Sequence, residues 1–157
     1  YFGKSLSEDK ETGEVTVAKE TITEETPAFK NMYFKNISVN GAAQALKIMG
    51  IPEMPVANIE FENMIIRSDV GVQINYASKI AFKNLDLRLD KPGIAVSFSD
   101  SKNVSLNGLK STGENQMFWV GGLETKDISL KTNGKKMVMN KDLKVLESIK
   151  GEVKVLD

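Results

Sequence analysis

Apolar and polar residues alternate with a spacing of two along most of the chain. Ile59 and Phe61 flank Glu60, and Ile80 and Phe82 show the same alternation. A period of two places every second side chain on one face of an extended strand, whereas an amphipathic helix repeats about every 3.6 residues. The pattern therefore predicts short β-strands, each with one buried face.

A short pattern recurs five times along the chain. In its full form it reads apolar, any, apolar, any, asparagine, apolar. The first apolar position of each copy is occupied by Met32, Ile59, Ile80, Val104 and Ile128, which gives steps of 27, 21, 24 and 24 residues. A second alternating pair follows each of the first four copies, namely Leu46/Ile48, Val72/Ile74, Ile94/Val96 and Phe118/Val120.

Each repeat therefore contains at least two short strands, separated by turn-forming residues such as Asp90-Lys91-Pro92-Gly93. Two strands in a unit of near 24 residues are typical of one coil of a parallel β-solenoid. Such coils stack about 4.8 Å apart, and their inward side chains form continuous apolar ladders. The sequence predicts an all-β fold, a parallel β-helix of about five coils.

Asparagine recurs where the chain turns after a strand, at Asn36, Asn63 and Asn84. Asparagine tolerates the left-handed backbone conformation, and its amide can bond to the equivalent amide of the next coil. We expect a structural ladder of stacked asparagines that ends at the fourth copy, where the residue is Gly108. The alternative is three unrelated turn asparagines.

Length and pattern predict a single domain over residues 1–157. Residues 3–26 are polar and are expected to form an excursion or loop before the repeat coils of residues 27–130. Residues 131–157 alternate lysine with apolar residues and are expected to close the last coil as charged edge strands or a cap. The first coil, near Phe29, has no comparable cap in front of it, and this asymmetry indicates further coils upstream.

The composition excludes several kinds of chemistry. The chain has 21 basic and 21 acidic residues, only Arg67 and Arg88 are arginines, and we expect no nucleic-acid partner. It contains no histidine and no cysteine, which excludes His-based catalysis, thiol nucleophiles and disulfides. Its apolar runs are too short for a membrane span, and no motif predicts a cofactor or a metal site.

Two groups of charged residues and one aromatic residue are candidates for function. Glu60 and Glu62 project from one strand face, which for glutamate is usually a solvated surface. Asp86, Arg88 and Asp90 also share one face and can form ion pairs. The only tryptophan, Trp119, is expected to face outward, where it either stacks on a sugar or ligand ring or is covered by a neighbouring turn.

The segments 24–37 and 50–63, above all the Gly-Ile-Pro-Glu-Met-Pro turn at 50–55, resemble the C-terminal coils of bacterial polygalacturonase-like proteins, glycoside hydrolase family 28. The resemblance extends over roughly residues 1–130. It implies a right-handed parallel β-helix that continues upstream. For the parent protein it implies inverting hydrolysis of galacturonan in pectin, outside the cytoplasm in the periplasm or medium.

The four catalytic motifs of that family, Asn-Thr-Asp, Asp-Asp, Gly-His-Gly and Arg-x-Lys, are absent from the chain. We therefore expect the 157-residue chain to be inactive by itself. By the same resemblance, Tyr1 corresponds to a substrate-contacting tyrosine of the family, or else is an ordinary strand-end residue. The alternatives for function are a non-enzymatic β-solenoid that binds polysaccharide or a protein partner through its strand faces or Trp119, and a lyase of the same architecture.

Overall fold

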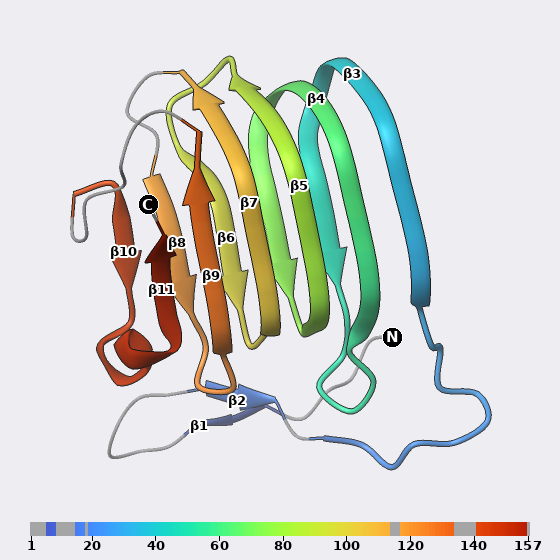
Figure 1. The fold of residues 1–157 in the computed structure, drawn as a ribbon. Helices are drawn as coiled ribbons and strands as arrows, with labels where there is room; N and C mark the ends of the chain where they lie inside the picture. The colour runs from blue at the N-terminus through green and yellow to red at the C-terminus, as the bar shows by residue number, and fades with distance from the viewer. Residues whose placement is uncertain (1–5, 9–14, 18, 114–116, 134–140, 157) are drawn as a thin grey trace.

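The computed structural model describes residues 6–8, 15–17, 19–113, 117–133 and 141–156. Parallel strands wind into a β-solenoid of about five turns, which confirms the predicted all-β fold (Figure 1). The first two coils are continuous bent strands, β3 (Lys30–Met49) and β4 (Val56–Asn75). The next three each combine two strands: β5 (Ala77–Leu89) with β6 (Ile94–Ser99), β7 (Lys102–Thr112) with β8 (Met117–Gly121), and β9 (Lys126–Thr132) with β10 (Leu143–Val145).

The register between coils follows the sequence repeat. Met32 pairs with Ile59, Ile59 with Ile80, Ile80 with Val104, and Val104 with Ile128. From β4 onward each of these strands buries its alternate apolar side chains in one core, and most of those of β3 are partly buried against it. Repeats that are spaced 21 to 27 residues apart in the sequence are thus stacked in register in the structure.

One predicted strand pair was wrong. The structure aligns Val96 and Phe98, rather than Ile94 and Val96, with Val72 and Ile74 of the preceding coil. A register shift at the start of β6 leaves Ile94 46% exposed while Phe98 is fully buried. Because alternation does not reveal this shift, it placed the pair two residues too early.

The polar excursion contains structure of its own. β1 (Leu6–Glu8) and β2 (Val15–Val17) pair antiparallel and form a separate two-stranded sheet. Thr23 and Thr26 then form a turn, in which the Thr26 amide donates to the Thr23 carbonyl over 3.1 Å. The expected loop is therefore interrupted by a small β-ladder.

The C-terminal segment closes the last coil. β10 pairs with β8, and β11 (Val153–Leu156) pairs with β9. Between them lies the short 3-10 helix η1 (Glu147–Glu152), whose Ile149 is buried against the core. The two C-terminal strands therefore extend the stacked strands, with η1 between them.

Candidate functional site

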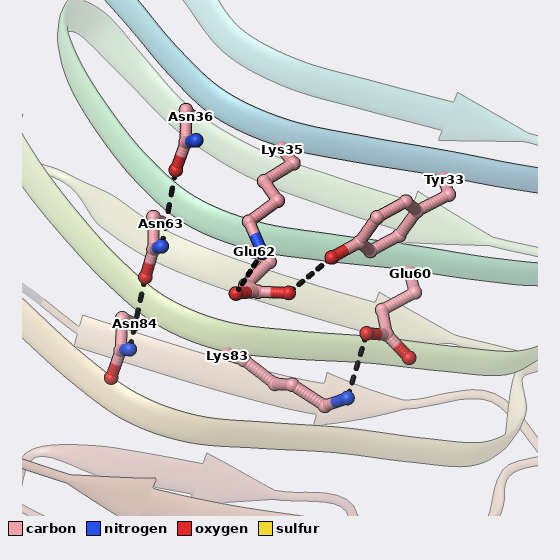
Figure 2. Close-up of polar contacts among 8 residues, drawn as sticks. All are labelled: Tyr33, Lys35, Asn36, Glu60, Glu62, Asn63, Lys83 and Asn84. Atoms are coloured by element: carbon pink, nitrogen blue, oxygen red, sulfur yellow. Dashed lines mark hydrogen bonds and ion pairs between the residues drawn. The ribbon is translucent and has the colours of Figure 1, made fainter.

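One group of polar contacts lies on the outward face of the first three coils, just before the asparagine turn (Figure 2). The Glu62 carboxylate of β4 accepts a hydrogen bond from the Tyr33 hydroxyl and forms a 2.8 Å ion pair with Lys35, both from β3. On the same face, Lys83 of β5 lies 2.6 Å from the Glu60 carboxylate. These contacts join neighbouring coils through their side chains.

Electrostatics favours the charged forms of Glu62, Lys35 and Lys83. The Lys35 hydrogen bond, followed by that of Tyr33, holds the pKa of Glu62 below its ordinary value. In return, the bond to Glu62 raises the pKa values of Tyr33 and Lys35, and the bond to Glu60 raises the pKa of Lys83. A carboxylate held ionised by lysines is unsuited to act as a general acid. We therefore assign this group to surface ion pairing rather than to catalysis.

The three predicted ladder asparagines are stacked in successive coils, as Figure 2 shows. The Asn63 amide donates to the Asn36 side-chain oxygen, and the Asn84 amide donates to that of Asn63, each over 3.1 Å. All three have left-handed backbone, with φ between 54° and 60°. Their shared conformation turns the chain, and their amides connect one turn to the next.

The ladder changes character at Gly108. Its φ of 80° continues the left-handed turn, but a Cβ at this position would lie 2.7 Å from the side-chain oxygen of Asn84. Glycine is thus required both by the conformation and by the close approach of Asn84. The amide chain ends at Asn84, while the turn itself continues.

A second ladder was missed by the sequence reasoning. Asn58 donates its amide to the Asn31 side-chain oxygen over 2.7 Å. The left-handed conformation recurs at the same place in every coil, at Asn31, Asn58, Lys79, Asn103 and Asp127, with φ between 53° and 62°. The signal was an asparagine or aspartate directly before the first apolar position in four of the five copies.

The second group of charged residues, Asp86, Arg88 and Asp90, forms ion pairs both within one coil and between coils. Arg88 pairs with Asp86 over 3.1 Å within β5, and its hydrogen bond holds the pKa of Asp86 below the usual value. Asp90 pairs instead with Arg67 of the preceding coil, over 2.8 Å. Lys110 lies 3.9 Å from Asp86 on the other side. Both acids are thus paired with basic neighbours.

Trp119 lies on the outward face of β8 and is 36% exposed. Its register neighbours are Ser97 in β6 and Lys144 in β10. A Cβ at Gly121 would lie 2.3 and 2.4 Å from two carbons of the indole, so the ring lies against the glycine backbone. The indole is therefore packed against the backbone on one side and partly accessible to solvent. It is neither fully free to stack on a ligand ring nor fully covered, the two alternatives that the sequence left open.

Several expectations concern features that the structure does not place. Tyr1 lies outside the described residues. In the described part of the chain, no group of three or more histidine, cysteine, aspartate or glutamate residues is arranged to hold a metal ion. No helix among the same residues has the length and apolar character needed to cross a membrane.

No protein-family model, no curated protein and no solved structure matches the chain.

Proposed function

We propose that this chain forms the last coils of a longer β-solenoid, in which further parallel coils precede β3. The observation that carries the proposal is the outer edge of β3. Its backbone pairs with β4 on one side, and no described strand pairs with it on the other. An unpaired edge 20 residues long presents a row of N–H and C=O groups that another strand can satisfy.

The side chains behind this edge favour the same arrangement. An apolar hollow of about 450 Å³ opens at the end of the first coil, lined by residues that include Met32, Phe34 and Val39. Phe34 stacks on Phe61, with ring centres 5.2 Å apart, and Phe61 stacks on Phe82 at 4.7 Å. Among the described residues, Phe34 has an aromatic neighbour on one face alone. A preceding coil with an apolar residue at this position would extend the stack and fill the hollow.

The asparagine ladders also support a preceding coil. In each ladder the later asparagine donates its amide to the oxygen of the earlier one. The amide groups of Asn31 and Asn36 therefore have no asparagine to donate to among the described residues. An asparagine one coil earlier would accept these hydrogen bonds with the same geometry.

For the parent protein we propose a polygalacturonase-like glycoside hydrolase that acts on galacturonan in pectin outside the cytoplasm. The support is the resemblance of segments 24–37 and 50–63 together with the β-solenoid fold. The described carboxylates of this chain that form ion pairs are held by lysine or arginine, and the chain has no histidine. The general acid and the water-activating carboxylates would belong to the preceding coils.

The test compares residues 1–157 with the natural polypeptide that contains them. We expect the natural polypeptide to carry coils before β3 and to release reducing ends from polygalacturonate, and we expect residues 1–157 to release none. Turnover by residues 1–157, or a natural polypeptide without hydrolytic activity, would overturn the hydrolase proposal.

Hydrogen exchange tests the coil proposal separately. Amides of β3 should exchange more slowly in the natural polypeptide than in residues 1–157, because a preceding strand protects them. Amides of β9, four coils away, serve as the control and should exchange equally in both. Equal exchange of β3 in the two proteins would contradict a preceding coil.

A non-enzymatic solenoid that binds polysaccharide is the second candidate function. The observation that favours it is the partly exposed indole of Trp119 on a rigid strand. It predicts saccharide binding by residues 1–157 alone and no turnover in any longer form.

A further inference from the structure

The dipeptide asparagine-glycine occurs three times in the chain, at positions 40–41, 107–108 and 133–134. In this dipeptide the backbone nitrogen of the glycine can attack the asparagine side chain, because glycine has no side chain that hinders the approach. The attack requires the backbone to rotate away from its strand conformation, so local opening of the structure decides which pair reacts. Gly134 lies outside the described residues, whereas the other two pairs lie in strands β3 and β7.

The first pair lies at an irregular place on the open edge of the solenoid. Asn40 is in register with Arg67 and Ala42 with Ser68, so Gly41 is an extra residue without a partner in β4. Asn40 and Gly41 are both exposed, and Gly41 has a left-handed φ of 77°. Apart from its chain neighbours, no atom lies within 4 Å of a Cβ placed on Gly41. No described strand pairs with the other edge of β3, so the backbone is held from one side only.

The second pair is enclosed by coils on both sides. Asn107 is in register with residues of β5 and of β9, the two neighbouring strands. Gly108 is buried, and its carbonyl accepts a hydrogen bond from the Asn133 side-chain amide over 3.5 Å. A Cβ on Gly108 would lie 2.7 Å from the side-chain oxygen of Asn84. Rotation of this backbone would therefore disturb contacts with two coils.

We propose that Asn40 is a site of spontaneous deamidation. The backbone nitrogen of Gly41 forms a bond with the side-chain carbon Cγ of Asn40, and the bond from Cγ to Nδ2 breaks. The proton of the Gly41 amide leaves with Nδ2 as ammonia, and a five-membered succinimide remains. Water then adds to one of the two ring carbonyls and opens the ring. The product is aspartate or isoaspartate, in which the main chain runs through the former side-chain carbon.

The new carboxylate would arise next to a cation. Register pairing places the Cα atoms of residues 40 and 67 about 4.8 Å apart. The Arg67 side chain is 57% exposed and contacts Asp90 through Nε over 2.8 Å, and its terminal N–H groups can donate to a second carboxylate. Isoaspartate in addition lengthens the main chain of β3 by one methylene. Deamidation therefore changes both the charge and the backbone of the first coil.

The test compares the two described pairs within one chain. Purified residues 1–157 are incubated at physiological temperature and mildly alkaline pH, and peptide mapping by mass spectrometry follows each asparagine. We expect Asn40 to convert at least about tenfold faster than Asn107, because its backbone opens more easily. In urea, where the fold is lost, the two should convert at similar rates. Equal rates in the folded chain, including no conversion at either position, would overturn the proposal, as would an equal preference for Asn40 in urea.

A conservative variant provides the matched control. Asn40→Gln keeps the amide and the exposed position, but its attack would close a larger ring, which forms far more slowly. Because the chain has a formal net charge of zero, isoelectric focusing separates each deamidated form, and Asn40→Asp marks the position of the aspartate product. Asn40→Gln should lose the form that comigrates with Asn40→Asp and leave the Asn107 rate unchanged. Its persistence at the original rate, with circular dichroism showing a folded variant, would contradict deamidation at Asn40.

A further comparison rests on the proposed preceding coils. A strand paired with the free edge of β3 would hold its backbone from both sides, so Asn40 should convert more slowly in the natural polypeptide than in residues 1–157. Equal Asn40 rates in the two proteins would count against a preceding coil and leave the site in residues 1–157 standing. Equal rates at Asn40 and Asn107 within residues 1–157 would overturn the site and leave the coil proposal as it stands.

Discussion

The two ends of the solenoid differ in how they terminate the core. At the end formed by β3, the apolar residues Met32 and Phe34 are only partly buried, and they border an open hollow. At the opposite end, Leu130 and Leu143 are fully buried, and Ile149 of η1 is 4% exposed. The apolar core is thus partly exposed at the β3 end and covered at the opposite end.

The backbone edges show the same contrast. β3 presents a long edge, while β10 and β11 are 3 and 4 residues long and carry the exposed Lys144 and Lys154. Short charged edges discourage further strand pairing, whereas a long edge backed by apolar side chains favours it. The two ends therefore differ in how much unpaired backbone and apolar surface they present, which is the contrast on which the proposed preceding coils depend.

The largest expected difference in stability is between a substitution in the middle of the core and one at the open end. Phe82→Ala should lower the free energy of unfolding by about 3–5 kcal/mol, because it removes a side chain that is 1% exposed. Phe34→Ala should cost less than about half as much, because its side chain borders the hollow. Urea unfolding measures both. Equal losses would show that Phe34 is as well packed as the central ring.

A single substitution at the closed end tests whether η1 stabilises the last coil. Ile149→Ala should lower the free energy of unfolding by about 2–4 kcal/mol, because it leaves a cavity where η1 covers the last coil. Ile22→Ala is the matched control; its side chain is 55% exposed and its loss should change stability by less than about 0.5 kcal/mol. Similar effects of the two substitutions would argue that η1 does not cap the core.

The asparagine ladder gives a smaller and more specific comparison. Asn63→Ala should cost about 2–3 kcal/mol, since it removes two amide bonds and places alanine at φ 54°. Asn63→Gly should cost less, because glycine adopts this conformation without strain. Asn36→Ala, at the open end, loses one ladder bond and should cost less than Asn63→Ala. A reversed order in urea unfolding would contradict the ladder as a stabilising feature.

The smallest effect is the pH dependence of the ion pairs at the two ends. Lys35 lowers the pKa of Glu62 in the folded state, and Lys102 lowers that of Glu124. A lowered folded-state pKa contributes stability above the ordinary value of 4.5 and loses it as the pH falls through the lower folded value. Glu62→Gln and Glu124→Gln should each make the acid-induced loss of stability shallower. An unchanged pH profile in both variants would show that solvent screens these exposed pairs completely.

Much of the fold could be predicted because its information is local and repeated. Ile59, Ile80 and Val104 have the same neighbours in sequence, and the structure places them in register. The pair at Ile94 failed because a register shift has no signature in simple alternation. The second left-handed position could be recognised at Asn58 and Asn103, but Lys79 at the same place carries no turn preference.

The candidate sites were less predictable than the coils. The outward direction of Trp119 follows from alternation, but its support by Gly121 depends on the rotamer that packing selects. Likewise, alternation placed Asp86, Arg88 and Asp90 on one face, yet Asp90 pairs with Arg67 of the preceding coil. Partners between coils depend on register, which residue spacing alone does not define.

The sequence by itself determined the strand period, the repeat length and the asparagine turns, because each follows from residues within one coil. The tertiary structure alone decided which coil ends are open or closed, which charges pair and which face of Trp119 is accessible. Many of these properties depend on residues more than 20 positions apart in the chain, such as Glu60 and Lys83, that only stacking brings together. Local alternation specifies the coil, and contacts between coils specify the surfaces on which function depends.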